Sequence, residues 1–262
     1  MSSPYRAVGD LWVLASSQPA PGHGVLPVNA YLFRSDTSVL VDTGLPTQRG
    51  EFLEALWSLV PPAQLAAVVL THEDADHAGN LFAVLEAAPQ ARLVTNYVTL
   101  AKLQEGASVP LDRVQVVNPG QPVPGTERRL TVVRPPVYDA PGTVGVHDRG
   151  TGAVLTVDAF GTYLPEPVAD LRDVAEADVL RGLADFNRMN HPWTALADQS
   201  RFDAAVAAVA ELRPTLLLSS HGALARDRTE LLLEGLRSLP AMDPYVPPDQ
   251  AAFEELKPEM GG

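Results

Sequence analysis

Short apolar runs alternate with stretches of helical periodicity along most of the chain. Four or five apolar residues between turn residues are typical of buried strands. We expect strands at residues 11–14, 29–33, 38–42, 66–70, 92–95, 114–117, 130–133, 143–147, 153–157 and 215–219. Apolar residues at helical spacing predict helices at residues 49–59, 81–88, 98–104, 171–186 (interrupted), 202–212 and 231–239. Strands occur in runs with helices between the runs, which favours an αββα sandwich over an alternating parallel sheet.

Two stretches show neither pattern. Residues 18–27 are rich in Pro and Gly, which predicts a loop, and this loop carries His23. The chain from Pro240 onward is rich in Pro, Gly and Glu and predicts a loosely attached extension. We therefore expect one domain over residues 1–240 and a C-terminal tail over residues 241–262.

One loop combines several metal-capable side chains. His72, Asp74, Asp76 and His77 fall within six positions, between a predicted buried strand and a predicted helix. Side chains on a short loop can converge on one point, and a strand behind the loop keeps them there. Imidazole and carboxylate together are a ligand set for iron, manganese or zinc. The alternative interpretation is a solvated acidic loop with two surface histidines.

Composition narrows the class of protein. The 262 residues contain 46% hydrophobic residues, which indicates a globular chain, and no Cys, which excludes disulfides and thiolate metal sites. The formal net charge of -13, with no cluster of Lys and Arg, argues against binding to nucleic acid or to an anionic membrane. Neither a signal peptide nor a membrane-spanning run is visible, so we expect a cytoplasmic protein.

Three further metal-capable side chains stand beside predicted strands. Asp139 precedes the strand at residues 143–147, Asp158 follows the strand at residues 153–157, and His221 follows the strand at residues 215–219. A glycine after His221 and another after Asp139 allow the backbone to approach closely.

These motifs together resemble a metallo-β-lactamase-superfamily domain over nearly the whole chain. Asp42-Thr43-Gly44 is similar to the early Asp-x-Gly turn of the superfamily, and the loop from His72 to His77 is similar to its His-x-His-x-Asp-His motif. Asp74 stands where hydrolases carry the second His. A carboxylate at this position resembles the flavodiiron branch, as do the stretches Asp158-Ala159-Phe160-Gly161, Asn118-Pro119-Gly120 and Ser220-His221-Gly222.

The resemblance implies a four-layer αββα fold and two metal ions. The implied ligands are His72, Asp74 and Asp139 for the first ion, Asp76, His77 and His221 for the second, and Asp158 as a bridge. In the family a His occupies the position of Asp139. Asp74 is also one methylene shorter than the Glu of the flavodiiron branch. His147, the nearest alternative to Asp139, is expected to be a surface residue.

The charge of this ligand set favours redox chemistry. The four Asp residues of the set would balance two divalent ions, and anionic ligands stabilise higher oxidation states. We therefore expect iron, with manganese or zinc as alternatives, and a protein that binds or reduces dioxygen or a related small molecule. The alternatives are a metal-dependent hydrolase that uses a bridging hydroxide and a catalytically silent oxygen or metal sensor.

Four other residues are candidates for the surroundings of the ions. His23, Tyr163 and His191 are expected near the pocket, and Asp42 is expected to support a ligand rather than to bind metal itself.

Flavodiiron proteins carry a flavodoxin domain after the metal domain, and no phosphate-binding loop is recognisable near the end of the printed sequence. We therefore expect no flavin in this chain and a separate electron-donor protein. The resemblance also implies a homodimer.

Overall fold

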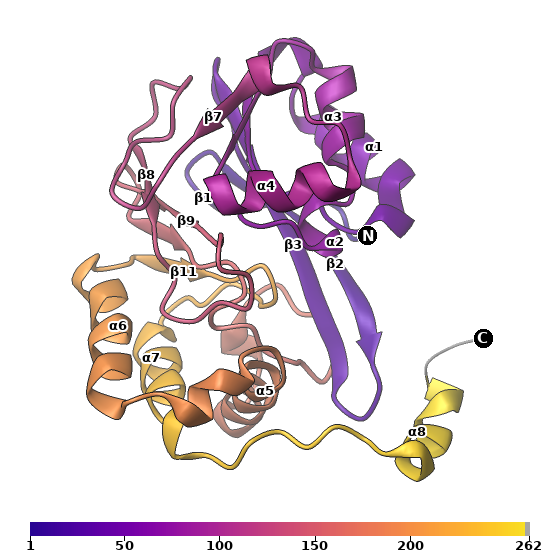
Figure 1. The fold of residues 1–262 in the computed structure, drawn as a ribbon, viewed down its shortest axis with the longest axis vertical. Coiled ribbons are helices and arrows are strands. Elements are labelled where there is room, and N and C mark those ends of the chain that lie inside the picture. The colour runs from indigo at the N-terminus through magenta and orange to yellow at the C-terminus, as the bar shows by residue number, and fades with distance from the viewer. Residues whose placement is uncertain (260–262) are drawn as a thin grey trace. The chain divides into compact units, whose positions relative to one another are not determined.

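The computed structural model describes residues 1–259, so the last three residues of the predicted tail lie outside the described part. The chain forms two compact units. The first unit comprises Met1–Ser16, Val28–Arg134 and Ala140–Leu155. The second comprises Ser17–Pro27, Pro135–Asp139 and the described part of Thr156–Gly262. Helices and strands of both units are labelled in Figure 1.

A seven-stranded sheet with its strands in chain order forms the centre of the first unit. The strands are β1 (Tyr5–Val8), β2 (Leu11–Ala20), β3 (Gly24–Phe33), β4 (Ser38–Val41), β5 (Leu65–Val69), β6 (Arg92–Thr95) and β7 (Val114–Val116). Residues 17–20 of β2 and 24–27 of β3 belong to the second unit. Strands β4 to β7 are parallel, with Val41 beside Val69 and Val69 beside Val94. The carboxyl ends of β4 and β5 therefore meet at one edge, where Asp42 and Thr71 follow.

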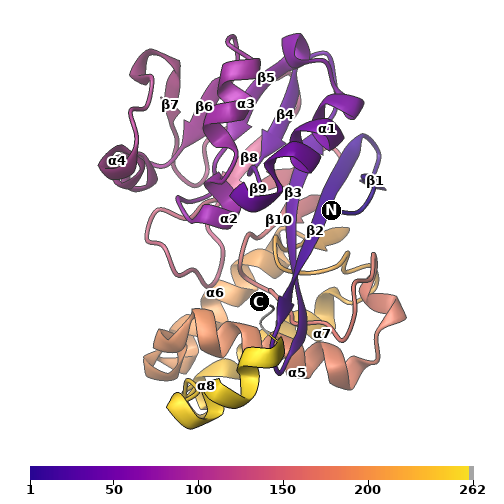
Figure 2. The same cartoon turned by 90° about the vertical axis from the view of Figure 1, so that its right-hand side faces the viewer.

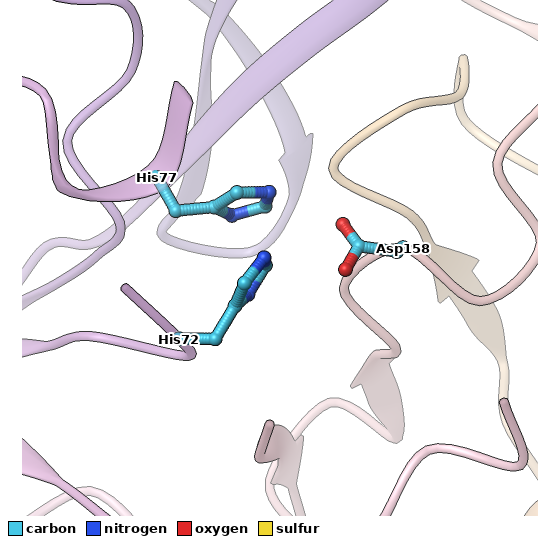
Figure 3. Close-up of side chains that lie close together, drawn as sticks. All are labelled: His72, His77 and Asp158. Atoms are coloured by element: carbon cyan, nitrogen blue, oxygen red, sulfur yellow. The ribbon is translucent and has the colours of Figure 1, made fainter. Parts of the chain in front are cut away.

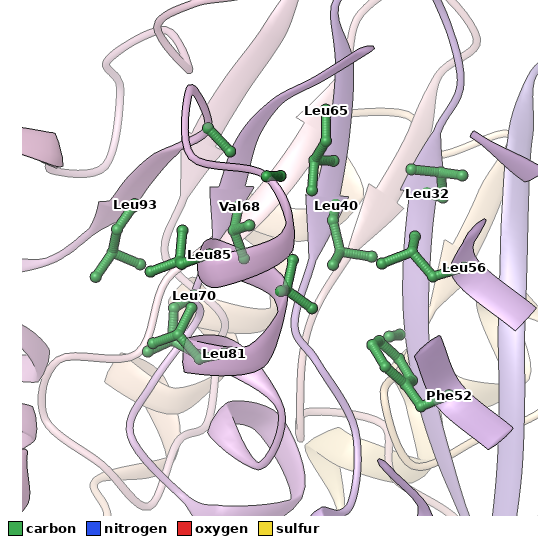
Figure 4. Close-up of a cluster of buried hydrophobic side chains, with 14 of the residues drawn as sticks. Leu32, Leu40, Phe52, Leu56, Leu65, Val68, Leu70, Leu81, Leu85 and Leu93 are labelled. Atoms are coloured by element: carbon green, nitrogen blue, oxygen red, sulfur yellow. The ribbon is translucent and has the colours of Figure 1, made fainter. Parts of the chain in front are cut away.

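Both faces of this sheet are covered. Helices α1 (Arg49–Leu59), α3 (Leu81–Ala87) and α4 (Tyr97–Gly106) belong to the first unit, and α1 and α3 lie along one face of the sheet (Figure 2). Because strand residues alternate between faces, one set of buried side chains packs under these helices (Figure 4), and it includes Leu32, Leu40, Val68, Leu70 and Leu93. The alternate residues are also buried, namely Tyr31, Phe33, Val39, Val41 and Val69.

A second sheet accounts for the burial of the alternate residues. Strands β8 (Leu130–Val133), β9 (Gly145–Asp148) and β10 (Ala153–Leu155) pair antiparallel in the first unit. The guanidinium of Arg128, next to β8, lies 5.1 Å from the ring centre of Phe33 and donates to Asp148 at 3.0 Å. The Asp148 carboxylate is buried, and bonds from Thr151, Gly150 and Arg128 lower its pKa against the opposing effect of burial.

Helices dominate the second unit. They are α5 (Glu176–Asn190), α6 (Gln199–Glu211), α7 (Thr229–Arg237) and α8 (Gln250–Leu256). Helix α7 packs against both α5 and α6 (Figure 1). Strand β11 (Leu216–Leu218) runs beside the chain that continues from β10, since Thr156 N–H donates to Leu218 and Ser220 N–H donates to Val157, both at 2.8 Å.

The mixed α/β fold with two sheets was predicted correctly. The helix at 49–59 and the strands at 92–95 and 130–133 have the predicted bounds, and the segment at 171–186 is interrupted before α5. The predicted loop at residues 18–27 is wrong, because β2 extends to Ala20 and β3 begins at Gly24. Pro19 and Pro27 lie within these strands, and Pro21 lies in the turn between them. Strand β1 was missed because Arg6 interrupts its apolar pattern.

The hairpin strands end earlier or begin later than predicted. Strand β9 covers Gly145–Asp148 rather than 143–147, and β10 ends at Leu155 rather than at residue 157. The early end of β10 has a local cause, because Val157 adopts a φ of 60°, which lies outside the β region. None of the helices within residues 1–259 is long and apolar enough to cross a bilayer.

Gly79 allows close packing beside the loop from His72 to His77, which is called the donor loop below because it carries four predicted ligands. A Cβ atom at this position would lie 2.4 Å from the Gly44 carbonyl oxygen and 2.5 Å from that of Ala75. We predict that Gly79→Ala lowers the free energy of unfolding by about 1–3 kcal/mol through overpacking. Gly50→Ala in α1 is the matched control, because a Cβ there meets nothing within 4 Å. Chemical denaturation of both variants tests this, and equal stabilities would contradict it.

Candidate metal centre

A buried carboxylate holds the base of the donor loop in the first unit. Asp42 follows β4 with a φ of 61° and is 1% exposed. Its Oδ1 accepts from the Thr71 N–H at 2.9 Å, and its Oδ2 accepts from the Thr71 hydroxyl at 2.9 Å. Three polar groups therefore fix the point at which the loop leaves the parallel strands. The Thr43 hydroxyl and N–H add bonds to the His77 carbonyl, both at 2.7 Å.

The same carboxylate orients His77. Its Nδ1 lies 2.8 Å from Asp42 Oδ2. A carboxylate accepts only, so Nδ1 carries the proton and Nε2 presents its lone pair. This arrangement is how proteins fix the tautomer of a metal-binding histidine. The observation supports the prediction that Asp42 acts through a ligand.

His72 is oriented in a similar way. Its Nδ1 lies 3.2 Å from the Thr71 hydroxyl oxygen, whose proton is donated to Asp42. The oxygen therefore accepts from Nδ1–H, and Nε2 of His72 also presents a lone pair. The rings of His72 and His77 lie with their centroids 4.0 Å apart (Figure 3).

The distances between donor atoms fit a metal ion better than a hydrogen bond. His72 Nε2 lies 3.7 Å from Asp74 Oδ2, and His77 Nε2 lies 3.7 Å from Asp76 Oδ2. Both separations exceed the length of a hydrogen bond. Two ligand atoms that each lie about 2.0–2.2 Å from one ion are separated by such a distance. The first unit thus brings together four of the seven predicted ligands.

The second unit brings together two more. His221 Nδ1 donates to the carbonyl oxygen of Pro27 at 2.9 Å, so its Nε2 is left for other partners. That Nε2 lies 3.1 Å from Asp158 Oδ1. Both side chains are about 95% buried. Two acceptor atoms this close require a cation, a proton or a metal ion, between them. The donor chemistry of this pair therefore also fits a metal ion.

A strained turn, with one strained residue on either side of Asp158, positions the Asp158 carboxylate. Figure 3 shows this side chain. Val157 and Phe160 have φ angles of 60° and 66°, which non-glycine residues rarely adopt. The Ser219 hydroxyl donates to the Val157 carbonyl at 2.7 Å and holds this turn against β11. A Cβ on Gly161 would lie 2.2 Å from the Phe186 ring, so only glycine fits there. The turn is thus built to aim Asp158.

Asp139 is the last residue of a short segment of the second unit and is exposed. Trp193 anchors this segment, because its Nε1–H donates to the Tyr138 carbonyl at 3.1 Å and its ring lies 6.0 Å from the Tyr138 ring. Its role as a ligand stays a prediction. The alternative His147 lies in β9, paired with Thr131 and Val154, and burial lowers its pKa.

The predicted pocket residues form a row of rings in the second unit. His23 stacks on Tyr163 at 4.8 Å, Tyr163 lies 5.6 Å from Phe186, and Phe186 lies 5.2 Å from His221. His191 is fully buried, 6.4 Å from Phe186. Burial, with Tyr245 and Asp185 nearby, raises the pKa of Tyr163 to about 12, so its hydroxyl stays protonated.

The sequence analysis missed the residues that position or cover the predicted ligands. Thr71, Pro27 and Phe186 position or cover donor residues, but no motif marks them. Glu73 was passed over as a ligand, and the structure gives the reason, because its Oε1 contacts Lys102 Nζ at 2.5 Å. The charge of Lys102 could have suggested this pair, but not its location.

A family model described as the metallo-beta-lactamase superfamily matches residues 23–214. A putative diflavin flavoprotein A 1 from Thermosynechococcus vestitus is 32% identical over 135 residues, which is 52% of this chain and 24% of the relative. A nitric oxide reductase from Moorella thermoacetica is 28% identical over 140 residues, 53% of this chain and 35% of the relative. The matched segment thus spans about a quarter to a third of the length of these relatives.

Solved flavodiiron structures share the fold. Rubredoxin oxygen:oxidoreductase from Desulfovibrio gigas matches 93% of this chain and 63% of its own, with a TM-score of 0.78 and 18% identity. A fragment of putative diflavin flavoprotein A 5 from Nostoc sp. matches 91% of this chain and 96% of its own, with a TM-score of 0.76 and 18% identity. The chain belongs to the metallo-beta-lactamase superfamily, and about half of it is similar in sequence to a diflavin flavoprotein.

Proposed function

We propose that this chain binds two non-haem metal ions, iron in preference to manganese or zinc, and reduces or binds dioxygen or nitric oxide. The observation that carries the proposal is the orientation of three histidines. Acceptors or hydroxyls occupy Nδ1 of His72, His77 and His221, and each Nε2 faces a carboxylate oxygen at 3.7, 3.7 and 3.1 Å. Relatives named as nitric oxide reductase and diflavin flavoprotein support the redox class.

Seven side chains each offer one ligand atom: His72, Asp74, Asp76 and His77 in the first unit, and Asp139, Asp158 and His221 in the second. We propose the ligand sets that the family implies, with Asp158 shared by both ions. When bound, two iron ions would supply one-electron redox chemistry toward a diatomic oxidant. Four Asp against three His favours the higher oxidation states of iron over the polarising charge that hydrolysis needs.

The chain's own residues orient these donors and restrict water. Asp42 and Thr71 hold both histidines of the loop, and the Pro27 carbonyl holds His221. The Phe186 ring covers one side of His221. Tyr163, whose hydroxyl donates to the Met189 sulfur at 3.2 Å, keeps its proton at neutral pH. Within each unit, hydrogen bonds thus orient the donor side chains.

Electrons and assembly complete the proposal. Histidine and carboxylate groups are not redox-active, so we propose that a separate redox protein or a neighbouring subunit supplies the electrons. We also propose a homodimer, which the flavodiiron resemblance supports, together with a cytoplasmic location and one metal-binding domain over residues 1–240. The favoured substrates are uncharged diatomic molecules, which the net charge of -13 does not repel.

Asp42→Asn tests the orientation of the donors. The amide offers one acceptor oxygen and turns an N–H toward Thr71 or His77, so the His77 tautomer is no longer fixed. We predict a loss of about 10- to 100-fold in metal affinity and of about 1–3 kcal/mol in the free energy of unfolding. The exposed Asp36→Asn is the matched control. Metal titration and denaturation measure both effects, and unchanged affinity in Asp42→Asn would contradict the assignment.

Metal content and turnover test the function. Protein loaded anaerobically with Fe(II) is expected to retain two ions per chain and, with an artificial reductant, to consume dioxygen or nitric oxide. His77→Ala is expected to abolish consumption, because it removes a ligand of the second ion. Stoichiometric zinc, no consumption and turnover of an ester or phosphodiester panel would instead identify a hydrolase.

A further inference from the structure

Helix α4 contacts the back of the donor loop through one ion pair. Lys102, one of only two lysines in the sequence, reaches Glu73 at 2.5 Å. Its side chain is 41% exposed, whereas that of Glu73 is 13% exposed. The hydrogen bond to Glu73 raises the pKa of Lys102, so the ammonium stays charged. Lys102 of α4 is thus paired with Glu73, which lies in sequence between the predicted ligands His72 and Asp74.

Glu73 points away from the donors on either side of it. His72 and Asp74 face each other across 3.7 Å, whereas the Glu73 side chain extends to α4. Within the described residues, Glu73 Oε2 is buried and makes no hydrogen bond. A carboxylate this buried is costly unless a cation compensates it. Lys102 therefore fixes the side chain of Glu73, and with it the backbone between His72 and Asp74.

Helix α4 also abuts the segment that follows Asp139. A Cβ on Gly142 would lie 2.3 Å from Thr99 Oγ1 and 2.8 Å from Thr99 N, so this glycine sits directly on the helix. Val144 N–H donates to the Thr71 carbonyl at 3.1 Å and joins the same segment to the donor loop. Helix α4 therefore contacts both stretches that adjoin the predicted ligands of the first ion, one at Glu73 and one at Gly142.

We propose that Lys102 is a positioning residue for the first metal ion and acts through Glu73. This inference rests on the proposed function. The first ion has the greater need of such support, because Asp74 is short, 50% exposed and makes no capping bond at the start of α2 (Ala75–Ala78). The second ion does not depend on it, since Asp42 and Thr43 hold His77 independently of Glu73.

The experiment is a titration of the full chain with Mn²⁺, with free ion followed by electron paramagnetic resonance. The wild type is expected to bind two ions. Lys102→Met is expected to weaken one of them by about 10- to 100-fold and to leave the other within about twofold. Lys102→Arg keeps the charge and restores both. Lys257→Met breaks the exposed pair with Glu254 and serves as the matched control, with both ions retained.

A second variant covers the case in which Lys102→Met does not fold. The double variant Lys102→Met/Glu73→Gln removes the pair without leaving a buried charge, and it is expected to show the same selective loss of one ion. Two unchanged affinities in a folded variant, or equal weakening of both ions that Arg does not restore, would overturn the proposal. A wild-type chain that binds no ion would instead contradict the proposed function itself.

Discussion

The hydrogen bonds to the buried carboxylate of Asp42 determine the conformation of the donor loop. Asp42 must be paired because an isolated buried charge is prohibitively costly, and its partners are the Thr71 N–H, the Thr71 hydroxyl and His77 Nδ1. The hydrogen bond from His77 Nδ1 therefore both compensates the buried carboxylate and orients the imidazole. The parallel pairing of β4 with β5 makes this possible, since it brings Asp42 and Thr71 to one edge. The chain folds its loop and fixes its donor atoms with one set of bonds.

In the second unit, a backbone carbonyl orients the histidine instead of a carboxylate. The Pro27 carbonyl takes the proton of His221 Nδ1, and Nε2 then faces Asp158 at 3.1 Å. Strain at Val157 and Phe160 is the local cost of aiming this carboxylate, and bonds from Ser219 and the packing of Phe186 offset it. Strained turns persist where surrounding structure over-determines them, and they concentrate at functional sites. Both units thus present Nε2 atoms beside carboxylates, although they achieve it by different means.

Much of this was readable from sequence, for physical reasons. Apolar runs report burial, so the strands at 92–95 and 130–133 and helix α1 were placed to the residue. Motif spacing predicted His72, Asp74, Asp76 and His77 as ligands because neighbours on one loop can converge. Long-range partners were not readable: nothing in the sequence links Pro27 to His221 or Lys102 to Glu73, since these contacts depend on the tertiary fold. The hairpin at 18–27 was misjudged because Pro and Gly signal turns locally, whereas tertiary pairing there forms strands.

The central proposal is that His72, Asp74, Asp76, His77, Asp139, Asp158 and His221 bind a pair of metal ions. Anomalous diffraction from crystals of iron-loaded protein, recorded on both sides of the iron absorption edge, tests it most directly. The account predicts two peaks, one about 2 Å from His72 Nε2 and one about 2 Å from His77 Nε2, with Asp158 in contact with both. A single peak without His72, or peaks that Asp158 and His221 do not touch, would contradict it.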